Sequence, residues 1–83
     1  MNNEIRQKTK EMLGELWQEA LQLESVPNED DNFFDLGGNS YKAFFLVENL
    51  PDEYKDKVEI TDFYDCESFG EMIDIIADKM MEG

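Results

Sequence analysis

Apolar residues recur at steps of three and four positions near both ends of this chain, and this spacing constrains its fold more than any other feature. Such a spacing gathers side chains on one face of an α-helix, where they can be buried together. It predicts one helix from about Asn3 to Leu23 and another that begins at the capping-box pattern of Ser68 and Glu71. The apolar positions of the first helix are Ile5, Met12, Leu13, Leu16, Trp17, Ala20 and Leu21. Those of the last helix are Phe69, Met72, Ile73, Ile76, Ala77 and Met80.

The middle of the chain predicts further helical structure. A helix is expected over residues 40–50, because Pro51 cannot continue it. Residues 51–59 are interpreted as a charged connection, and Thr61-Asp62-Phe63-Tyr64 as a short helical turn. There is no strand pattern or repeat, and 83 residues make one domain, residues 1–83. We therefore expect an all-α fold, a small four-helix bundle of three main helices plus a short third helix.

Acidic side chains dominate the composition, since 21 Asp and Glu face only 7 Lys and Arg and give a net charge of −14. A surface of this sign repels nucleic acid and anionic membranes, so we expect neither as a partner. It favours proteins with basic patches, or it serves solubility alone. We expect the protein to be a monomer.

Histidine is absent and Cys66 is the single cysteine. A Ser-His-Asp or Cys-His site, an internal disulfide and a structural zinc site are therefore excluded. We expect no catalytic residue, no metal and no enzymatic activity, with Cys66 as a small core or boundary residue. Met1-Asn2-Asn3-Glu4 is not the start of a signal peptide, and no apolar run reaches membrane-spanning length. Together with the single cysteine, these features predict a cytoplasmic protein.

Residues 24–39 form the longest stretch without helical spacing. Their acidic part does not match a calcium-binding loop, because EF-hand spacing counted from Asp30 puts Phe34 at a ligand position. Phe33 and Phe34 are adjacent, and we expect at least one of them to be buried and to pin the loop to the core. Full burial of one phenylalanine stabilises a fold by about 1.5–3 kcal/mol.

The loop ends in a ten-residue segment, Asp31-Asn32-Phe33-Phe34-Asp35-Leu36-Gly37-Gly38-Asn39-Ser40. This segment resembles the attachment signature of peptidyl carrier proteins, the thiolation domains of non-ribosomal peptide synthesis. The resemblance continues through the segment Ile60–Ser68, with Phe63 and Tyr64 as its apolar pair, and so covers nearly the whole chain. It also includes the apolar positions Ala43, Leu46, Val47 and Leu50. The fold that it implies is acyl-carrier-protein-like.

The resemblance implies that Ser40 receives 4′-phosphopantetheine from coenzyme A, with Gly38 and Asn39 beside the attachment point. The thiol of this arm then holds an aminoacyl or acyl group as a thioester. The implied partners are a phosphopantetheinyl transferase, an adenylation or other loading enzyme, and downstream condensation, tailoring or thioesterase enzymes. Physical chemistry agrees, because a helix start attracts an anion and glycines leave the approach uncrowded. Since the chain begins with Met1 and ends shortly after the last helix, we expect a stand-alone carrier.

Three alternatives stay open at this point. The first is that Ser40 is only a helix cap, a role for which serine is common. The second is an acyl carrier protein of fatty-acid or polyketide type, although those carriers more often show Asp-Ser-Leu at the serine, where this chain has Gly-Gly-Asn-Ser. The third is an unmodified acidic adaptor that only binds a basic partner.

The helix expected over residues 40–50 carries two apolar stripes, and a helix in a small bundle buries only one. Ala43, Leu46, Val47 and Leu50 form the stripe expected to be buried. Tyr41, Phe44 and Phe45 lie nearly opposite, and we expect them to form a docking surface for partner enzymes beside the arm, partly covered by the loop or the short helix. Two departures from the family are Tyr41, where an aliphatic residue is usual, and Glu67, where Pro is frequent. Lys42 opposes the helix dipole, and lies either near the phosphate of the arm or simply in solvent.

Overall fold

The computed structural model describes residues 3–82, and within that range it contains five helices and no strand. The three main helices are α1 (Asn3–Leu21), α2 (Ser40–Glu48) and α5 (Phe69–Glu82). Two short helices, α3 (Asp52–Lys55) and α4 (Ile60–Asp65), lie between α2 and α5 in the sequence. The predicted all-α bundle is therefore confirmed, while the expected domain limits at residues 1 and 83 lie outside the described range.

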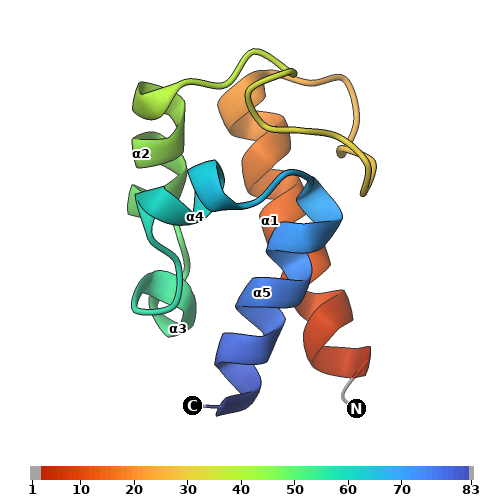
Figure 1. The fold of residues 1–83 in the computed structure, drawn as a ribbon, viewed down its shortest axis with the longest axis vertical. Helices are drawn as coiled ribbons and strands as arrows, with labels where there is room; N and C mark the ends of the chain where they lie inside the picture. Colours follow the sequence, from red (N-terminus) through yellow and green to blue (C-terminus); the bar gives the residue numbers. More distant parts are fainter. Residues whose placement is uncertain (1–2, 83) are drawn as a thin grey trace.

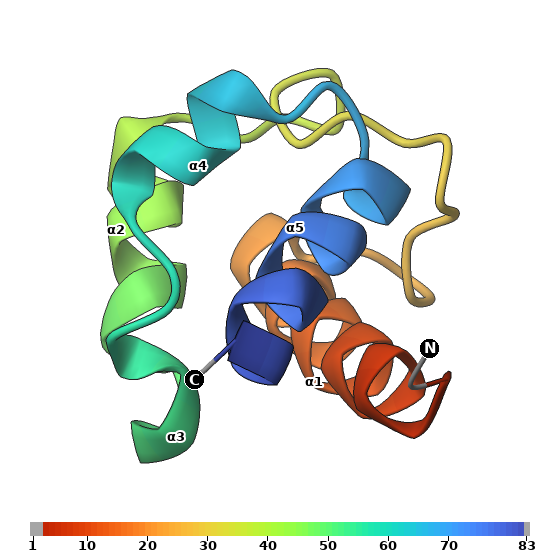
Figure 2. The ribbon, with the colours of Figure 1, turned by 60° about the horizontal axis from the view of Figure 1, so that its bottom comes forward.

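The helices are arranged around α1, which packs against both α5 and α2, while α4 packs against α2. α2 and α5 run antiparallel to α1, so that α1 ends at the same end of the bundle where α2 and α5 begin (Figure 1). The loop of residues 22–39 crosses this end, and α4 lies obliquely between α2 and α5 (Figures 1 and 2). The topology therefore places the loop, the start of α2 and α4 close together.

α1 ends two residues earlier than its periodicity predicts, at Leu21 rather than Leu23. The reason is Gln22, which adopts a left-handed conformation with φ 56°. The amide of Leu23 then donates to the carbonyl of Gln18 at 2.9 Å. This six-to-one hydrogen bond is the Schellman arrangement that closes many helices, although glycine usually occupies the left-handed position.

α2 also ends two residues early, at Glu48 instead of Leu50, with Asn49 as the C-terminal cap. Leu50 nevertheless is buried, as predicted for this stripe. The start of α5 agrees with the capping pattern, because the hydroxyl of Ser68 accepts a hydrogen bond from the amide of Glu71 at 3.2 Å.

α3 is the one helix that the sequence did not predict, since residues 51–59 were interpreted as a charged connection. Asp52 and Glu53 in its first turn favour a helix start. Tyr54 turns inward and is only 1% exposed, and its hydroxyl lies 3.2 Å from that of Thr9 in α1. A buried hydroxyl needs a partner, and Thr9 provides it. Helical periodicity cannot be recognised over four residues, which is why the prediction missed α3.

The core is one cluster with Trp17 of α1 at its centre. The ring of Trp17 meets Phe33 of the loop edge-on at a centroid distance of 5.0 Å and Phe69 of α5 at 4.8 Å. Phe63 of α4 contacts Phe33 at 4.8 Å. The loop, α1, α4 and α5 therefore each contribute one ring to a single aromatic cluster. Buried members of the predicted stripes of α1 and α5 are Leu13, Trp17, Ala20, Leu21, Phe69, Met72, Ile73, Ile76 and Ala77. The other predicted members, which are only partly buried, are Ile5, Met12, Leu16 and Met80.

An ionic cluster fixes the beginning of the loop to α1 and α5. Arg6 of α1 bonds Glu29 of the loop at 2.7 Å and Asp74 of α5 at 2.6 Å. Lys10 pairs with the other oxygen of the Glu29 carboxylate at 3.0 Å. The backbone carbonyl of Glu29 also accepts a hydrogen bond from the amide of Gly70 at 2.9 Å. One loop residue is thus held by side chain and main chain together.

Replacement Glu29→Gln is expected to reduce stability in a pH-dependent way. The hydrogen bond from Arg6, followed by that from Lys10, lowers the pKa of Glu29 from 4.5 to about 2. Because the pKa in the folded state lies below that in the unfolded state, this stabilisation is present above about pH 4.5 and is lost as the pH falls toward about 2. The Glu29 side chain is 39% exposed. Solvent screening therefore limits the loss at neutral pH to about 1 kcal/mol or less.

Urea unfolding followed by the fluorescence of Trp17 measures this effect, since the chain has a single tryptophan. The difference between the wild-type protein and Glu29→Gln should be largest near neutral pH and should shrink between about pH 4.5 and about pH 2. Glu24→Gln is the matched control, because Glu24 is an exposed carboxylate of the same loop. A difference that is independent of pH, or equal in both variants, would contradict the prediction.

Candidate functional site

Ser40 is the first residue of α2, and its side chain is exposed. The helix cap is not Ser40 but Asn39, whose backbone is extended and whose side-chain oxygen accepts a hydrogen bond from the amide of Lys42 at 2.9 Å. Capping occupies the side-chain oxygen of the residue that performs it. The alternative in which Ser40 serves only as the cap is therefore wrong, and its hydroxyl is not used in closing the helix start.

Asn32 organises the loop that leads to α2. Its side-chain oxygen accepts hydrogen bonds from the amides of Phe34 at 2.9 Å and Asp35 at 3.0 Å. Its side-chain nitrogen donates to the carbonyl of Glu67 at 2.9 Å. An asparagine that bonds the amides two and three residues ahead stabilises a tight turn. The loop is thus closed upon itself and attached to the segment that follows α4.

Phe33 is the residue that plugs the core, as predicted for one of the two phenylalanines, because it is 3% exposed whereas Phe34 is only partly buried. Gly38 lies directly against it: the amide of Gly38 donates to the carbonyl of Phe33 at 3.0 Å. A Cβ atom on Gly38 would lie 2.6 Å from that carbonyl oxygen and would also collide with the Phe33 ring. Gly37 has a different role, since its φ of +99° is a conformation that glycine favours.

Tyr64 of α4 reaches the start of α2, and its hydroxyl is hydrogen-bonded to the hydroxyl of Ser40. Its ring stacks on Phe34 with a centroid distance of 5.1 Å and an interplanar angle of 29°. The sequence predicted Tyr64 only as an apolar residue of a short helix. The contact with Ser40 spans 24 positions and depends on how α4 lies on α2, so no local sequence signal could have found it.

Lys42 is the one basic residue of the sequence between Lys10 and Lys55. Its ammonium group donates a hydrogen bond to the carbonyl of Gly37 at 3.2 Å. Of the two positions considered from the sequence, one in free solvent and one near the attachment point, this contact favours the second. The positive charge lies at the turn that precedes Ser40.

Tyr41, Phe44 and Phe45 are exposed by 79%, 52% and 37%, on the side of α2 that faces away from the core. Phe44 lies one helical turn beyond Ser40 and therefore on the same side of the helix. Tyr41 and Phe45 instead line a hollow of about 230 Å³ together with Ala20 of α1. In the opposite stripe Ala43, Leu46 and Leu50 are buried, as the sequence predicted, whereas Val47 is only partly buried.

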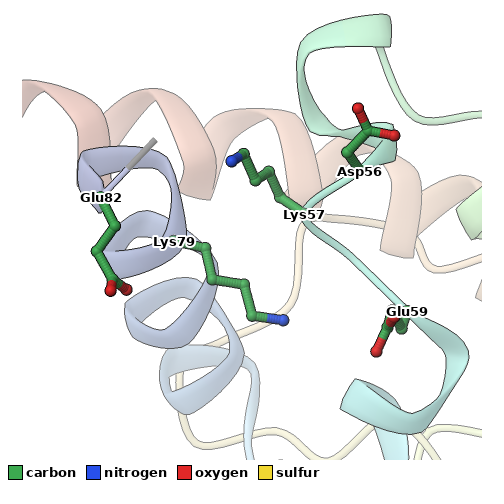
Figure 3. A pocket seen from close by; sticks show the side chains of 5 residues that line it. All are labelled: Asp56, Lys57, Glu59, Lys79 and Glu82. Atoms are coloured by element: carbon green, nitrogen blue, oxygen red, sulfur yellow. The ribbon is translucent and has the colours of Figure 1, made fainter.

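A larger hollow of about 370 Å³ lies away from Ser40, between α5 and the segment that follows α3 (Figure 3). Lys57 and Lys79 extend into this space from opposite sides. Lys79 is already paired with Asp62 at 3.2 Å. Its lining mixes both signs of charge in Asp56, Lys57, Glu59, Lys79 and Glu82. This lining consists of charged side chains and contains no hydroxyl, so the start of α2 is the better candidate site.

Cys66 is buried at the C-terminal cap of α4, which agrees with its predicted place at the core boundary. Burial, and then the nearby charge of Asp62, raises the pKa of its thiol to about 11. The reactive form is the thiolate, so Cys66 is unreactive near neutral pH. Within residues 3–82 there is no cluster of His, Cys, Asp or Glu that could hold a metal ion, and no helix there could cross a membrane.

Comparison with known proteins identifies the family of the chain. The family model for the phosphopantetheine attachment site matches residues 11–76, a range that includes the loop, Ser40 and α4. The chain belongs to the phosphopantetheine-attachment family. Its resemblance to carrier proteins is thus confirmed, and with it 4′-phosphopantetheine as the cofactor. No solved structure gives a significant match to the chain.

The relatives with similar sequences are very large synthases. Surfactin synthase subunit 2 of Bacillus subtilis (strain 168) is 42% identical over 50 residues, which are 60% of this chain and 1% of the synthase. Bacitracin synthase 3 of Bacillus licheniformis is 32% identical over 71 residues, 86% of this chain and 1% of the synthase. Bacitracin synthase 2 of the same species is 29% identical over 77 residues, 93% of this chain and 3% of the synthase. The chain therefore corresponds to one small segment of each relative.

Gly38→Ala is expected to displace Phe33 and so to loosen the loop that leads to Ser40. Because the new methyl group would meet a backbone oxygen, the collision cannot be relieved by turning a side chain, and a loss of about 1–3 kcal/mol is expected. The emission spectrum of Trp17 should change as well, since Phe33 packs against it. Urea unfolding and fluorescence provide both measurements.

Gly37→Ala is the matched control. No heavy atom lies within 4 Å of a Cβ atom at Gly37, so this variant should lose stability through backbone strain alone, by about 1 kcal/mol, and keep the native Trp17 emission. The packing role of Gly38 is refuted when Gly38→Ala leaves both the unfolding midpoint and the emission of the folded protein unchanged.

Proposed function

We propose that this chain is a stand-alone peptidyl or aminoacyl carrier protein in which Ser40 holds the 4′-phosphopantetheine arm. The observation that supports this most strongly is the exposed hydroxyl of Ser40 at the start of α2, which Asn39 frees from capping. When attached, the arm supplies a terminal thiol that holds an aminoacyl or acyl group as a thioester. The protein contributes no reacting group of its own beyond the attachment oxygen, and its role is delivery.

The residues around Ser40 suit an attached phosphodiester. The first hydrogen bond that closes α2 runs from the amide of Ala43 to the carbonyl of Asn39 at 2.9 Å. The amides of Ser40 and Tyr41 precede it and have no acceptor within the helix. These donors and the positive end of the helix dipole attract an anion, and the ammonium group of Lys42 adds charge of the same sign nearby.

The proposed partners follow from the need to load, use and empty the arm. A phosphopantetheinyl transferase attaches it, an adenylation or other loading enzyme charges it, and condensation, tailoring or thioesterase enzymes receive the cargo. The similarity to surfactin and bacitracin synthases supports a place in non-ribosomal peptide synthesis. We propose that residues 1–83 act as a single, monomeric carrier domain in the cytoplasm.

Incubation of the protein with coenzyme A, magnesium and a broad-specificity phosphopantetheinyl transferase tests the attachment. Intact mass should increase by one phosphopantetheinyl group in the wild-type protein and in Ser25→Ala, whose serine is exposed in the loop. The increase should vanish in Ser40→Ala. A folded wild-type protein that gains no mass would exclude the carrier function and leave the acidic adaptor.

The same reaction has an independent readout in thiol chemistry. Because burial raises the pKa of Cys66 to about 11, the unmodified folded protein should react slowly with Ellman's reagent. Attachment should add one thiol per chain that reacts fast, and Ser40→Ala should gain none. Fast reaction of the unmodified protein would contradict the assignment of Cys66 as an inert boundary residue.

The exposed aromatic residues Tyr41, Phe44 and Phe45 are proposed as the docking surface for these enzymes. Phe44→Ala and Phe45→Ala should each lower kcat/KM for arm attachment or cargo transfer by about tenfold, since a buried interface aromatic contributes more than 1 kcal/mol. Val26→Ala is the control, because Val26 is 55% exposed but lies on the loop away from α2. Unchanged kinetics in folded Phe44→Ala and Phe45→Ala would refute this surface.

A further inference from the structure

An unbroken series of aromatic contacts connects the core to the hydroxyl of Ser40. The ring of Trp17 meets Phe33 at 5.0 Å, and Phe33 meets Phe34 edge-on at 5.5 Å. Phe34 stacks on Tyr64 at 5.1 Å, and the hydroxyl of Tyr64 bonds that of Ser40. Each ring is therefore held by the one before it, from the buried centre to an exposed serine.

α4, which carries Tyr64, is itself fixed in place. Phe63 is 1% exposed in the core and contacts Phe33 at 4.8 Å. Asp62 closes the start of α4 by accepting a hydrogen bond from the amide of Glu59 at 2.8 Å, and it pairs with Lys79 of α5 at 3.2 Å. Although Tyr64 is 56% exposed, its hydroxyl therefore has a defined position relative to α2.

A serine hydroxyl at an exposed helix start would otherwise divide its time among three staggered rotamers. A hydrogen bond to a fixed partner selects one of them, and here it holds the oxygen on the side of α2 that faces α4. Since Asn39 performs the capping, no other hydrogen bond of the helix start competes for this hydroxyl.

We propose that Tyr64 is a positioning residue for the attachment reaction, because its hydroxyl holds the Ser40 oxygen in one rotamer. The inference rests on the proposed function. In the reaction the Ser40 oxygen forms a bond to the β-phosphorus of coenzyme A, the phosphoanhydride bond breaks, and adenosine 3′,5′-bisphosphate leaves. The proton of the serine hydroxyl passes to a base of the transferase. The esterified oxygen has no proton left, so only Tyr64 can donate in the contact afterwards.

Tyr64→Phe tests the proposal, since it removes the hydroxyl and keeps the ring that stacks on Phe34. Thr61→Val is the matched control, because it removes an exposed hydroxyl of the same helix that makes no bond to Ser40 in the described structure. Without this hydrogen bond the Ser40 oxygen would divide its time among about three rotamers, of which one is oriented for the reaction. We therefore expect kcat for arm attachment to fall about threefold in Tyr64→Phe. KM for the carrier, thermal stability and all values for Thr61→Val should stay as in the wild-type protein.

Nuclear magnetic resonance of the unmodified protein gives a readout that does not depend on any enzyme. The chain has three serines, so selective serine labelling yields signals for Ser25, Ser40 and Ser68 alone. The couplings between the α and β protons of Ser40 should report one rotamer in the wild-type protein and an average in Tyr64→Phe. Those of Ser68, which bonds the amide of Glu71, should not change.

The inference is supported when kcat falls and the Ser40 couplings become averaged in Tyr64→Phe alone. It is overturned when kcat stays equal or rises, when the couplings of Ser40 are the same in both proteins, or when Thr61→Val has the same effects. Failure of the wild-type protein to accept the arm would instead refute the proposed function. The coupling measurement would still show whether Tyr64 orients Ser40, so the two failures are distinguishable.

Discussion

The burial of Phe33 is the interaction on which the geometry around Ser40 depends. Its ring contacts Trp17 and Phe63, and its carbonyl accepts the amide of Gly38, two residues before the helix. Burial of a phenylalanine contributes about 1.5–3 kcal/mol. Each aromatic pair adds about 0.5–1.5 kcal/mol. In a domain whose total stability is about 5–15 kcal/mol, this is enough to hold a polar loop in one conformation. Phe34 and Leu36 also pack against the core but are only partly buried, so Phe33 is the main apolar contact between this loop and the bundle.

Ion pairs and a charged hydrogen bond hold the loop in place together with apolar burial. Arg6, Lys10 and Lys79 pair with carboxylates that join the loop, α1, α4 and α5, while Lys42 bonds a carbonyl of the glycine turn. Lys8 also pairs with Glu53 of α3, so five of the seven basic residues are engaged within the fold. The net charge of −14 makes the surface of the protein acidic. An acidic surface speeds encounter with proteins that carry basic patches.

Sequence patterns predicted those features that depend on neighbours in the chain and missed those that depend on packing. The two long amphipathic helices, the buried Phe33 and the exposed aromatic stripe of α2 follow from spacing alone. Asn39 and Ser40 are equally good caps by residue type, and only the structure shows that Asn39 is the cap, directly after Gly38 packs against Phe33. The hydroxyl bond between Tyr64 and Ser40 joins positions that no pattern connects.

The stability of the fold does not account for the aromatic residues on the outer side of α2. Apolar side chains stabilise a protein only through the area that they remove from water, and Tyr41 and Phe44 remain more than half exposed. Their exposure is consistent with the docking surface proposed for partner enzymes. Phe44 shares its side of α2 with Ser40, whereas Tyr41 and Phe45 line the hollow against Ala20 of α1. A partner that covers Phe44 and this hollow would contact α1, α2 and the proposed attachment point at once. It would thereby recognise the folded domain rather than a single helix.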